Sequence, residues 1–330
     1  MPATGRSPRA RVAAPSSADP AAKVATDAIA MQLRALTVEH DKAAAGDVEA
    51  VHRLRVATRR LRAALRMLRE VAPGDEAATA ADELAWLCGA IGAVRDLDVL
   101  AQLLENRAAR LESDFIHALE PLSETIRHNR VVEQERLTEA LDSERYSGLV
   151  RRLGAITPEP AADGPTLGAM AARLVRPQVR ALLRAGAGLD EASAPNAFHR
   201  LRVRAKKLRY TLEPLRAVGG KALRKMLRQL ERIQERVGMY HDAVTAGTWL
   251  REWATESHEA PVMTMLASGA LIYSVDRRAR RLRLRGLKSW CRTDMDEIAR
   301  AALGELTQAA AKARRAAKPP LTLVPAVRAL

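Results

Sequence analysis

Two stretches of the chain repeat the same spacing of cationic side chains around a histidine. Both read His-Arg-Leu-Arg-Val, the first from residue 52 and the second from residue 199, an offset of 147 residues. The first continues at residue 59 as Arg-Arg-Leu-Arg and the second at residue 206 as Lys-Lys-Leu-Arg. Guanidinium, ammonium and imidazole groups donate hydrogen bonds to phosphate oxygens, and charged donors make the stronger bonds. The repeat therefore indicates an internal duplication and the binding of an anion.

A helical conformation places the cations of each copy on one face. Each residue of an α-helix turns by about 100°, so the leucines of both copies fall on the opposite side. We call the two sets of cationic side chains the first and the second stripe. The first stripe contains His52, Arg55, Arg59, Arg62 and Arg66, and the second contains His199, Arg202, Lys206 and Arg209.

The stripes need a partner because like charges three or four residues apart on a helix repel one another. Either a carboxylate on a neighbouring helix or an external polyanion would compensate them. The alternative is an ordinary solvated face whose long side chains cover apolar surface. Such a face usually mixes charges, whereas residues 52–69 contain seven arginines and no acid. The histidine also keeps the same helical position in both copies, which favours a binding surface.

Composition limits the class of partner. The chain of 330 residues has a formal net charge of +15, which favours nucleic acid, polyphosphate or an acidic membrane surface. Aromatic residues make up only 3%, which argues against a site that stacks single-stranded bases. A third basic run, residues 277–288, has no counterpart in the first copy. We interpret it as partly auxiliary binding surface and partly solvated face.

Neither a metal site nor a catalytic group is expected. His52 and His199 have arginines rather than further metal ligands beside them on the helix, so a phosphate suits them better than a cation. An imidazole beside phosphates should favour its charged form. Asp96 and Asp242 follow the two motifs in a repeated Gly-x-x-(Arg/His)-Asp element. We expect both near a helix end, capping the helix or pairing with a motif arginine.

The chain as a whole is predicted to be all-α, because alanine and leucine dominate and no strand-like alternation occurs. A helix over 22–45 should end at Gly46, and Asp47 should cap the motif helix, which runs to about residue 71. A third helix is expected at 76–93, and further helical stretches reach about residue 153.

The second half should repeat this plan. We expect helices at 167–185 and 196–218, with a kink or early stop at Pro214, and further helices to about residue 317. The proline-rich segment around residues 157–165 separates the halves. We predict five segments along the chain: a disordered basic tail 1–21, a first bundle 22–155, a linker 156–166, a second bundle 167–317 and a disordered tail 318–330.

The first 22 residues contain no continuous apolar stretch, so we expect no secretory signal there, and the longest uncharged run, residues 260–275, is short for a membrane span. Cys88 and Cys291 are far apart in sequence and form no metal-binding cluster, which favours a reducing cytoplasm. We therefore expect a cytoplasmic protein.

The repeated motif closely resembles the CHAD domain, the conserved-histidine α-helical domain. The segment from His52 to Arg62 matches the family's His-x-x-Arg-Val-x-x-Arg-Arg-Leu-Arg pattern, and the segment from Leu141 to Tyr146 resembles the one that closes the family's first half. The resemblance covers about residues 22 to 310. It implies two four-helix bundles with pseudo-two-fold symmetry, basic helices around a shared groove or pore, and binding of inorganic polyphosphate.

The family's binding residues carry over by position. The set is His52, Arg55, Arg59, Arg60 and Arg62 with His199, Arg202, Lys206, Lys207 and Arg209, to which helical projection adds Arg66. Lys206 and Lys207 replace arginines that are frequent in the family. Lysine contacts phosphate as a point charge and lacks the two-pronged fork of arginine, so the second half could bind less tightly.

Three functions follow, in order of preference. The first is non-catalytic binding of polyphosphate, which would target the protein to polyphosphate granules, with no cofactor. The second is a polyphosphate or triphosphate hydrolase or its accessory, since family relatives are sometimes joined to a CYTH triphosphatase domain. The Glu-x-Glu-x-Lys motif of that domain is absent, and the nearest string, at residues 133–137, lacks the lysine. The third is a protein that uses the stripes to bind nucleic acid.

Overall fold

The computed structural model describes residues 15–72, 74–156, 164–257 and 259–316. All regular structure within these residues is helical, and the only β-type pairing there is an isolated bridge between Pro20 and Thr166. The all-α prediction is confirmed.

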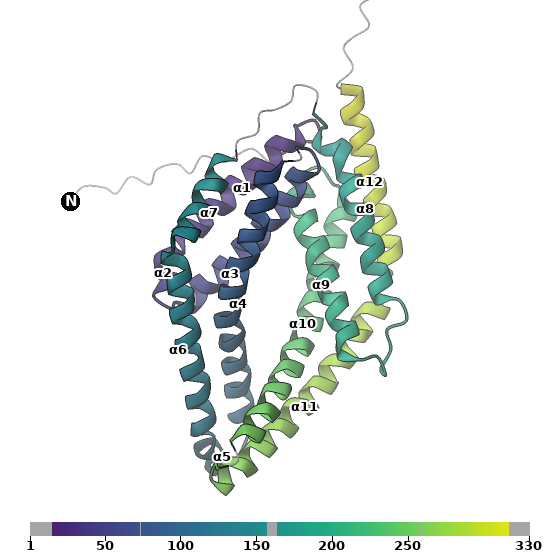
Figure 1. Ribbon diagram of the computed structural model, residues 1–330. Coiled ribbons are helices and arrows are strands. Elements are labelled where there is room, and N and C mark those ends of the chain that lie inside the picture. The colour runs from purple at the N-terminus through teal and green to yellow at the C-terminus, as the bar shows by residue number, and fades with distance from the viewer. Residues whose placement is uncertain (1–14, 73, 157–163, 258, 317–330) are drawn as a thin grey trace, which may run out of the picture.

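The helices fall into two groups that follow each other in the chain. The first group consists of α1 (Ala21–Val38), α2 (His40–Ala44), α3 (Val48–Arg69), α4 (Asp75–Ala108), α5 (Ser113–Ala118), α6 (Glu120–Asp142) and α7 (Glu144–Ala155). The second consists of α8 (Leu167–Gly186), α9 (Pro195–Leu212), the 3-10 helix η1 (Pro214–Ala217), α10 (Lys221–Glu256), α11 (Val262–Cys291) and α12 (Met295–Ala316). The groups stand side by side, and the long hairpins α4–α6 and α10–α11 converge at the α5 end (Figure 1).

Local signals set the start and end of the two motif helices. Gly46 has φ +85°, a left-handed conformation that suits glycine and ends α2. The next residue, Asp47, caps α3 by accepting a 2.6 Å hydrogen bond from the backbone N–H of Ala50. In the second half α9 ends at Leu212, and Pro214 begins a short 3-10 helix, so the early stop expected at this proline is confirmed.

The long helices differ from the prediction. Helix α4 continues to Ala108 instead of ending near residue 93, and α10 likewise continues past residue 242. Asp96 and Asp242 therefore lie inside helices, and their expected place near a helix end was wrong. A glycine such as Gly92 costs a helix only about 1 kcal/mol. The fully buried Ile91 and Val94 on either side of it offset that cost through their packing.

Two hydrophobic cores hold the groups together. The larger one includes the leucine faces of both motif helices, with Leu54, Leu61, Leu201 and Leu208 fully or almost fully buried. The smaller one joins the converging hairpins through residues such as Leu104 of α4 and Leu250 of α10. Helices α3 and α9, which carry the stripes, also contact each other across the boundary between the halves.

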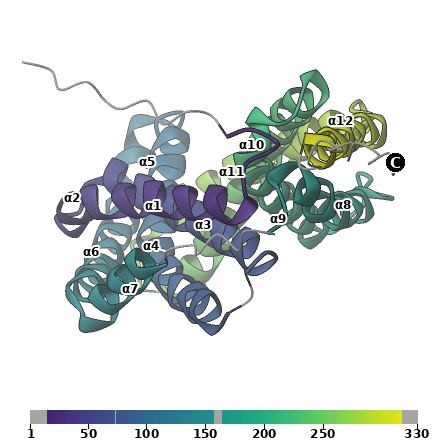
Figure 2. The same cartoon turned by 90° about the horizontal axis from the view of Figure 1, so that it is seen from above.

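The chain ends of the two groups are also tied by backbone hydrogen bonds. The N–H of Ala21 donates to the carbonyl of Pro165 at 3.0 Å, and the N–H of Leu167 donates to the carbonyl of Asp19 at 2.8 Å. The beginnings of α1 and α8 therefore lie close together, and Figure 2 shows the two groups from this end. Residues 16–20 take part in this contact, so ordered structure begins before the predicted start at residue 22.

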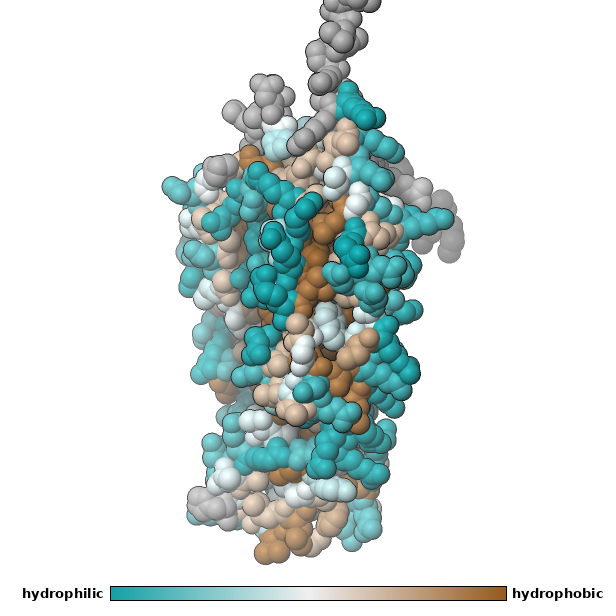
Figure 3. Space-filling model, turned by 90° about the vertical axis from the view of Figure 1, so that its right-hand side faces the viewer, coloured by the Kyte–Doolittle hydropathy of each residue, from teal (hydrophilic) through white to brown (hydrophobic). Residues whose placement is uncertain are grey.

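Several predicted segments cannot be compared. The tails at 1–14 and 318–330 and the linker residues 157–163 lie outside the described residues. Five long helices make up each half of the described chain, so the pair of four-helix bundles stays a prediction. No described helix is long and apolar enough to cross a membrane. The side of the molecule seen in Figure 3 is mostly hydrophilic, with a narrow hydrophobic strip along it.

Candidate anion-binding site between the two halves

The two stripes lie on the inner faces of α3 and α9, opposite the buried leucines. Most stripe side chains are half-buried, and His52 is exposed. Their charges influence one another across the boundary between the halves. Burial, followed by the charges of Arg202, Arg59 and Arg55, lowers the pKa of the Lys206 ammonium to about 7. Cations that are far apart in sequence therefore share one site.

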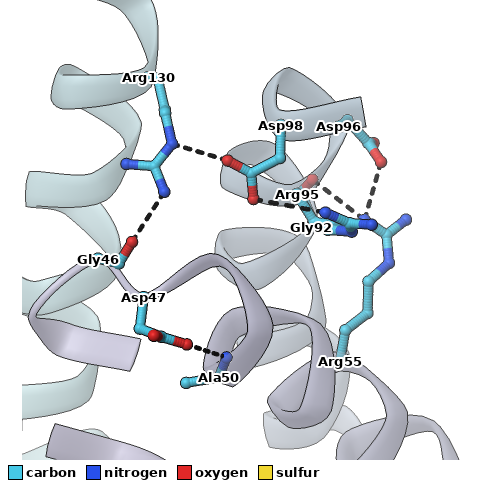
Figure 4. A network of polar contacts seen from close by, with 9 residues as sticks. All are labelled: Gly46, Asp47, Ala50, Arg55, Gly92, Arg95, Asp96, Asp98 and Arg130. Atoms are coloured by element: carbon cyan, nitrogen blue, oxygen red, sulfur yellow. Dashed lines mark hydrogen bonds and ion pairs between the residues drawn. The ribbon is translucent and has the colours of Figure 1, made fainter. Parts of the chain in front are cut away.

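Both halves repeat an arginine–aspartate pair between the motif helix and the following long helix. Arg55 Nη1 lies 2.8 Å from Asp96 Oδ1 and also donates to the carbonyl of Gly92 at 3.3 Å (Figure 4). The equivalent Arg202 Nη2 lies 3.8 Å from Asp242 Oδ1. The prediction that these aspartates pair with motif arginines is confirmed in both copies. Each pair orients one arginine and partly compensates the stripe.

A buried carboxylate holds the start of the first motif helix in place. Asp98 is only 8% exposed and accepts a 2.7 Å hydrogen bond from Arg130 Nε of α6. The same guanidinium donates to the carbonyl of Gly46 at 2.9 Å, directly before the Asp47 cap (Figure 4). Loss of either partner of a buried ion pair strongly destabilises the fold. Arg130 and Asp98 therefore link α4 and α6 to the start of α3 and so to the position of the first stripe.

The histidines are driven toward their neutral form. Although His52 is exposed, partial desolvation by its neighbours and then the charge of Arg95 lower its pKa, and burial followed by the charge of Arg202 lowers that of His199. In the second half His241 contacts His199, with 3.4 Å between the two Nδ1 atoms, and burial lowers the pKa of His241 to about 4. The charged imidazoles that are expected beside phosphates are therefore disfavoured in the free protein, and a bound anion is needed to favour them.

Two predicted binding residues are instead compensated by an acid from the second half. Glu213 accepts from Arg60 Nε across the boundary at 3.0 Å, and it lies 3.6 Å from Arg209 Nε. Arg209 also approaches Glu231 at 3.8 Å. Glu213 occupies the position equivalent to Arg66, 147 residues later, so the sequence contained a signal that was missed. Arg60 therefore lies in an ion pair at the edge of the site and not on the first stripe.

The remaining cations are less compensated. Arg59, Arg62 and Arg66 form no ion pair with another described residue, and the buried Nε atoms of Arg66 and Arg202 have no hydrogen-bond partner there. Lys207 has an exposed side chain, but partial desolvation by its neighbours and the charge of Arg66 still lower its pKa. Unpaired buried donors are costly and are usually satisfied by a partner. The site thus presents an excess of donors over acceptors, which suits an anion.

Sequence reasoning also missed an open cavity of about 380 Å³ beside the stripes, lined by residues of α4, α10 and α11 and by Arg110. Its arginines belong to neither repeated motif, and only Arg278 lies in the basic run 277–288. Within the described residues, no group of three or more His, Cys, Asp or Glu side chains is placed to hold a metal ion.

A family model for the CHAD domain matches residues 27–251. Two relatives from strains of Mycobacterium tuberculosis, both named as uncharacterized proteins, are 28% identical over 308 residues. The match covers 91% of this chain and 56% of each relative, so the chain spans about half their length.

Solved structures show the same architecture. The crystal structure of the CHAD domain from the plant Ricinus communis superposes with a TM-score of 0.68 at 28% identity, covering 91% of this chain and 97% of that one. PptA from Streptomyces chartreusis gives a TM-score of 0.67 at 17% identity, covering 83% of this chain and all of its own, which shows a shared fold alone.

Proposed function

Because the chain belongs to the CHAD domain family, we propose that it binds inorganic polyphosphate, without cleaving it, between its two stripes. One observation carries the proposal. The cations Arg55 and Arg59 of the first half and Arg202 of the second lie close enough to Lys206 that their charges add to burial in lowering its pKa to about 7. A polyanion entering this site would remove that repulsion and satisfy the unpaired donors of Arg66 and Arg202.

The chemistry of polyphosphate matches this arrangement. It is a linear polyanion without bases, so its receptor needs spaced cations and no stacking aromatics. Charge-assisted hydrogen bonds are worth about 1.5–3 kcal/mol each, and several of them can outweigh the ordering of the chain. Binding should weaken with salt, as for any polyanion that releases counterions.

A calorimetric titration with polyphosphates of defined length tests the proposal. We expect affinity to rise with chain length until both stripes are occupied, and to fall as salt is added. Equal affinity for orthophosphate and long chains would contradict a site that spans the two halves.

The non-catalytic part of the proposal rests on how the nearby carboxylates are used. Asp96 and Asp242 pair with arginines, so they are compensated by cations that would repel a catalytic metal. Incubation with long polyphosphate and Mg²⁺ or Mn²⁺ should release no phosphate above a blank. Metal-dependent release that tracks the protein through purification would revive the hydrolase alternative.

The nucleic-acid alternative is favoured only by the net charge of +15. Duplex DNA should compete poorly with polyphosphate when both are supplied at equal phosphate concentration.

We further propose that the protein is cytoplasmic and that polyphosphate binding places it on polyphosphate granules. A fluorescent fusion tests this, because loss of the stripe charges should disperse it.

A further inference from the structure

We infer that the cavity between α4, α10 and α11 is a second phosphate-binding site, which holds the continuation of a long polyphosphate chain leaving the stripes. The inference rests on the proposed function, because it takes the ligand of the stripes to be polyphosphate. It assigns a role to arginines that lie outside both repeated motifs.

The cavity has a strongly cationic wall. Arg107 of α4, Arg110 just after its end and Arg278 of α11 line it, and the carboxylate in the wall is Asp242 of α10. Its volume of about 380 Å³ falls within the range of about 300–1,000 Å³ that is typical of ligand sites. Three arginines against one carboxylate, already approached by Arg202, leave the wall with a net positive charge.

Arg107 is the strongest indication that the cavity binds an anion. The residue is only 4% exposed, yet it forms no ion pair and no side-chain hydrogen bond with another described residue. Burial and the nearby charges of Arg110, Arg278 and Arg281 lower its pKa. A buried charge is normally paired, because desolvation is costly. The neighbours of Arg107 increase that cost, so its position is explained by an oxyanion that contacts several of these guanidinium groups.

The arginines of the basic run at 277–288 differ in whether they face the cavity. Arg278 lines the cavity, and Arg281 lies close enough to influence Arg107. Arg283 points elsewhere and donates to the backbone carbonyls of Ser193, at 2.8 Å, and Glu191. Arg280 is exposed and, two residues from Arg278, projects from nearly the opposite side of α11. Only part of the run therefore serves the cavity.

The cavity continues the path of the stripes. Asp242 belongs to its wall and also approaches Arg202 of the second stripe at 3.8 Å. Along α4, eleven residues separate Asp96 from Arg107, which corresponds to about 17 Å of helix. Both points lie on the helices that converge toward α5 (Figure 1). A long chain can therefore reach from the stripes into the cavity, whereas a triphosphate cannot occupy both.

The test compares chain lengths in a cavity variant. Arg107→Gln with Arg278→Gln should weaken long-chain polyphosphate binding by at least about tenfold, the loss expected for one charge-assisted contact or more. Triphosphate binding to the stripes should change little. Arg280→Gln is the matched control on the same helix, and it should behave as the unaltered protein.

Thermal unfolding supplies a second readout, which distinguishes an arginine that binds an anion from one that only stabilises the fold. Removing the unpaired charge with Arg107→Gln should leave the melting temperature of the unliganded protein unchanged or raised. Polyphosphate should then stabilise the variant less than it stabilises the unaltered protein.

The outcomes are distinguishable. Unaltered long-chain affinity in the double variant, or a lowered melting temperature with Arg107→Gln, would overturn the cavity site while leaving the stripes as receptor. A failure of the unaltered protein to bind polyphosphate at any length would contradict the proposed function itself, and the inference would fall with it.

Discussion

The two halves share a scaffold but differ in charge at equivalent positions. Arg59 of the first half corresponds to Lys206, and Arg66 corresponds to Glu213. The first half therefore presents permanent cations. The second presents a lysine whose pKa is about 7 and an acid that pairs with Arg60 of the first half.

What both halves retain is equally informative. His52 and His199 keep the same place, and the pairs Arg55–Asp96 and Arg202–Asp242 recur between the motif helix and the next long helix. The shared residues orient the site, while the differing ones set its charge. The difference indicates that the halves contribute unequally to binding, and that the contribution of the second half depends on pH.

Reversing the central charge of both stripes should have the largest effect. Arg59→Glu with Lys206→Glu places two acids in the middle of the site, and we expect calorimetry to detect no polyphosphate binding. Arg152→Glu with Arg184→Glu makes the same change in net charge at exposed positions of α7 and α8, and should retain binding. Retained affinity in the stripe variant would refute the site between the halves.

Removing one central cation at a time should separate the halves. At pH 8 Arg59→Ala should weaken binding by about 10- to 100-fold, as expected for a lost charge-assisted contact. Lys206→Ala should weaken it less, because Lys206 is mostly uncharged at this pH before the ligand binds. Equal losses at pH 8 would show that the two halves bind alike.

The pH dependence of binding should trace to Lys206. Its pKa of about 7 in the free protein should rise beside phosphates, so binding at pH 8 takes up a proton and affinity should increase as the pH falls from 8 to 7. One such proton changes affinity by at most about tenfold per pH unit. Titrations of the unaltered protein and Lys206→Arg measure the effect, which the arginine should reduce to the part that the site histidines contribute. A variant that keeps the same slope would assign the proton to another group.

Removing the acid that distinguishes the second half from the first should have the smallest effect on polyphosphate affinity. Glu213→Gln removes the acid that compensates Arg60 and Arg209. Partly exposed ion pairs are worth about 0–1 kcal/mol, so polyphosphate affinity should rise by about 2- to 5-fold. Glu256→Gln, at an exposed position at the end of α10, is the matched control. Unchanged affinity would mean that Arg60 and Arg209 do not contact the ligand.

Local features of the site could be predicted because their causes are local. The Asp47 cap, the stop before Pro214 and the buried leucines follow from hydrogen bonding, ring geometry and the helical repeat. The positions of Asp96 and Asp242 inside long helices could not be predicted in the same way. Packing around Ile91 and Val94, which depends on other helices, outweighs the local preference of Gly92.

The sequence by itself determined the all-α class, the duplication and the alignment of cations opposite leucines, since an advance of about 100° per residue is a property of the helix alone. Tertiary structure decided which cations act together. It brought Arg59 beside Lys206, paired Arg60 with Glu213 and left Arg107 buried without an acid. The physical reason is that desolvation and charge pairing depend on distances between segments far apart in the chain, which only the packing of the two halves sets.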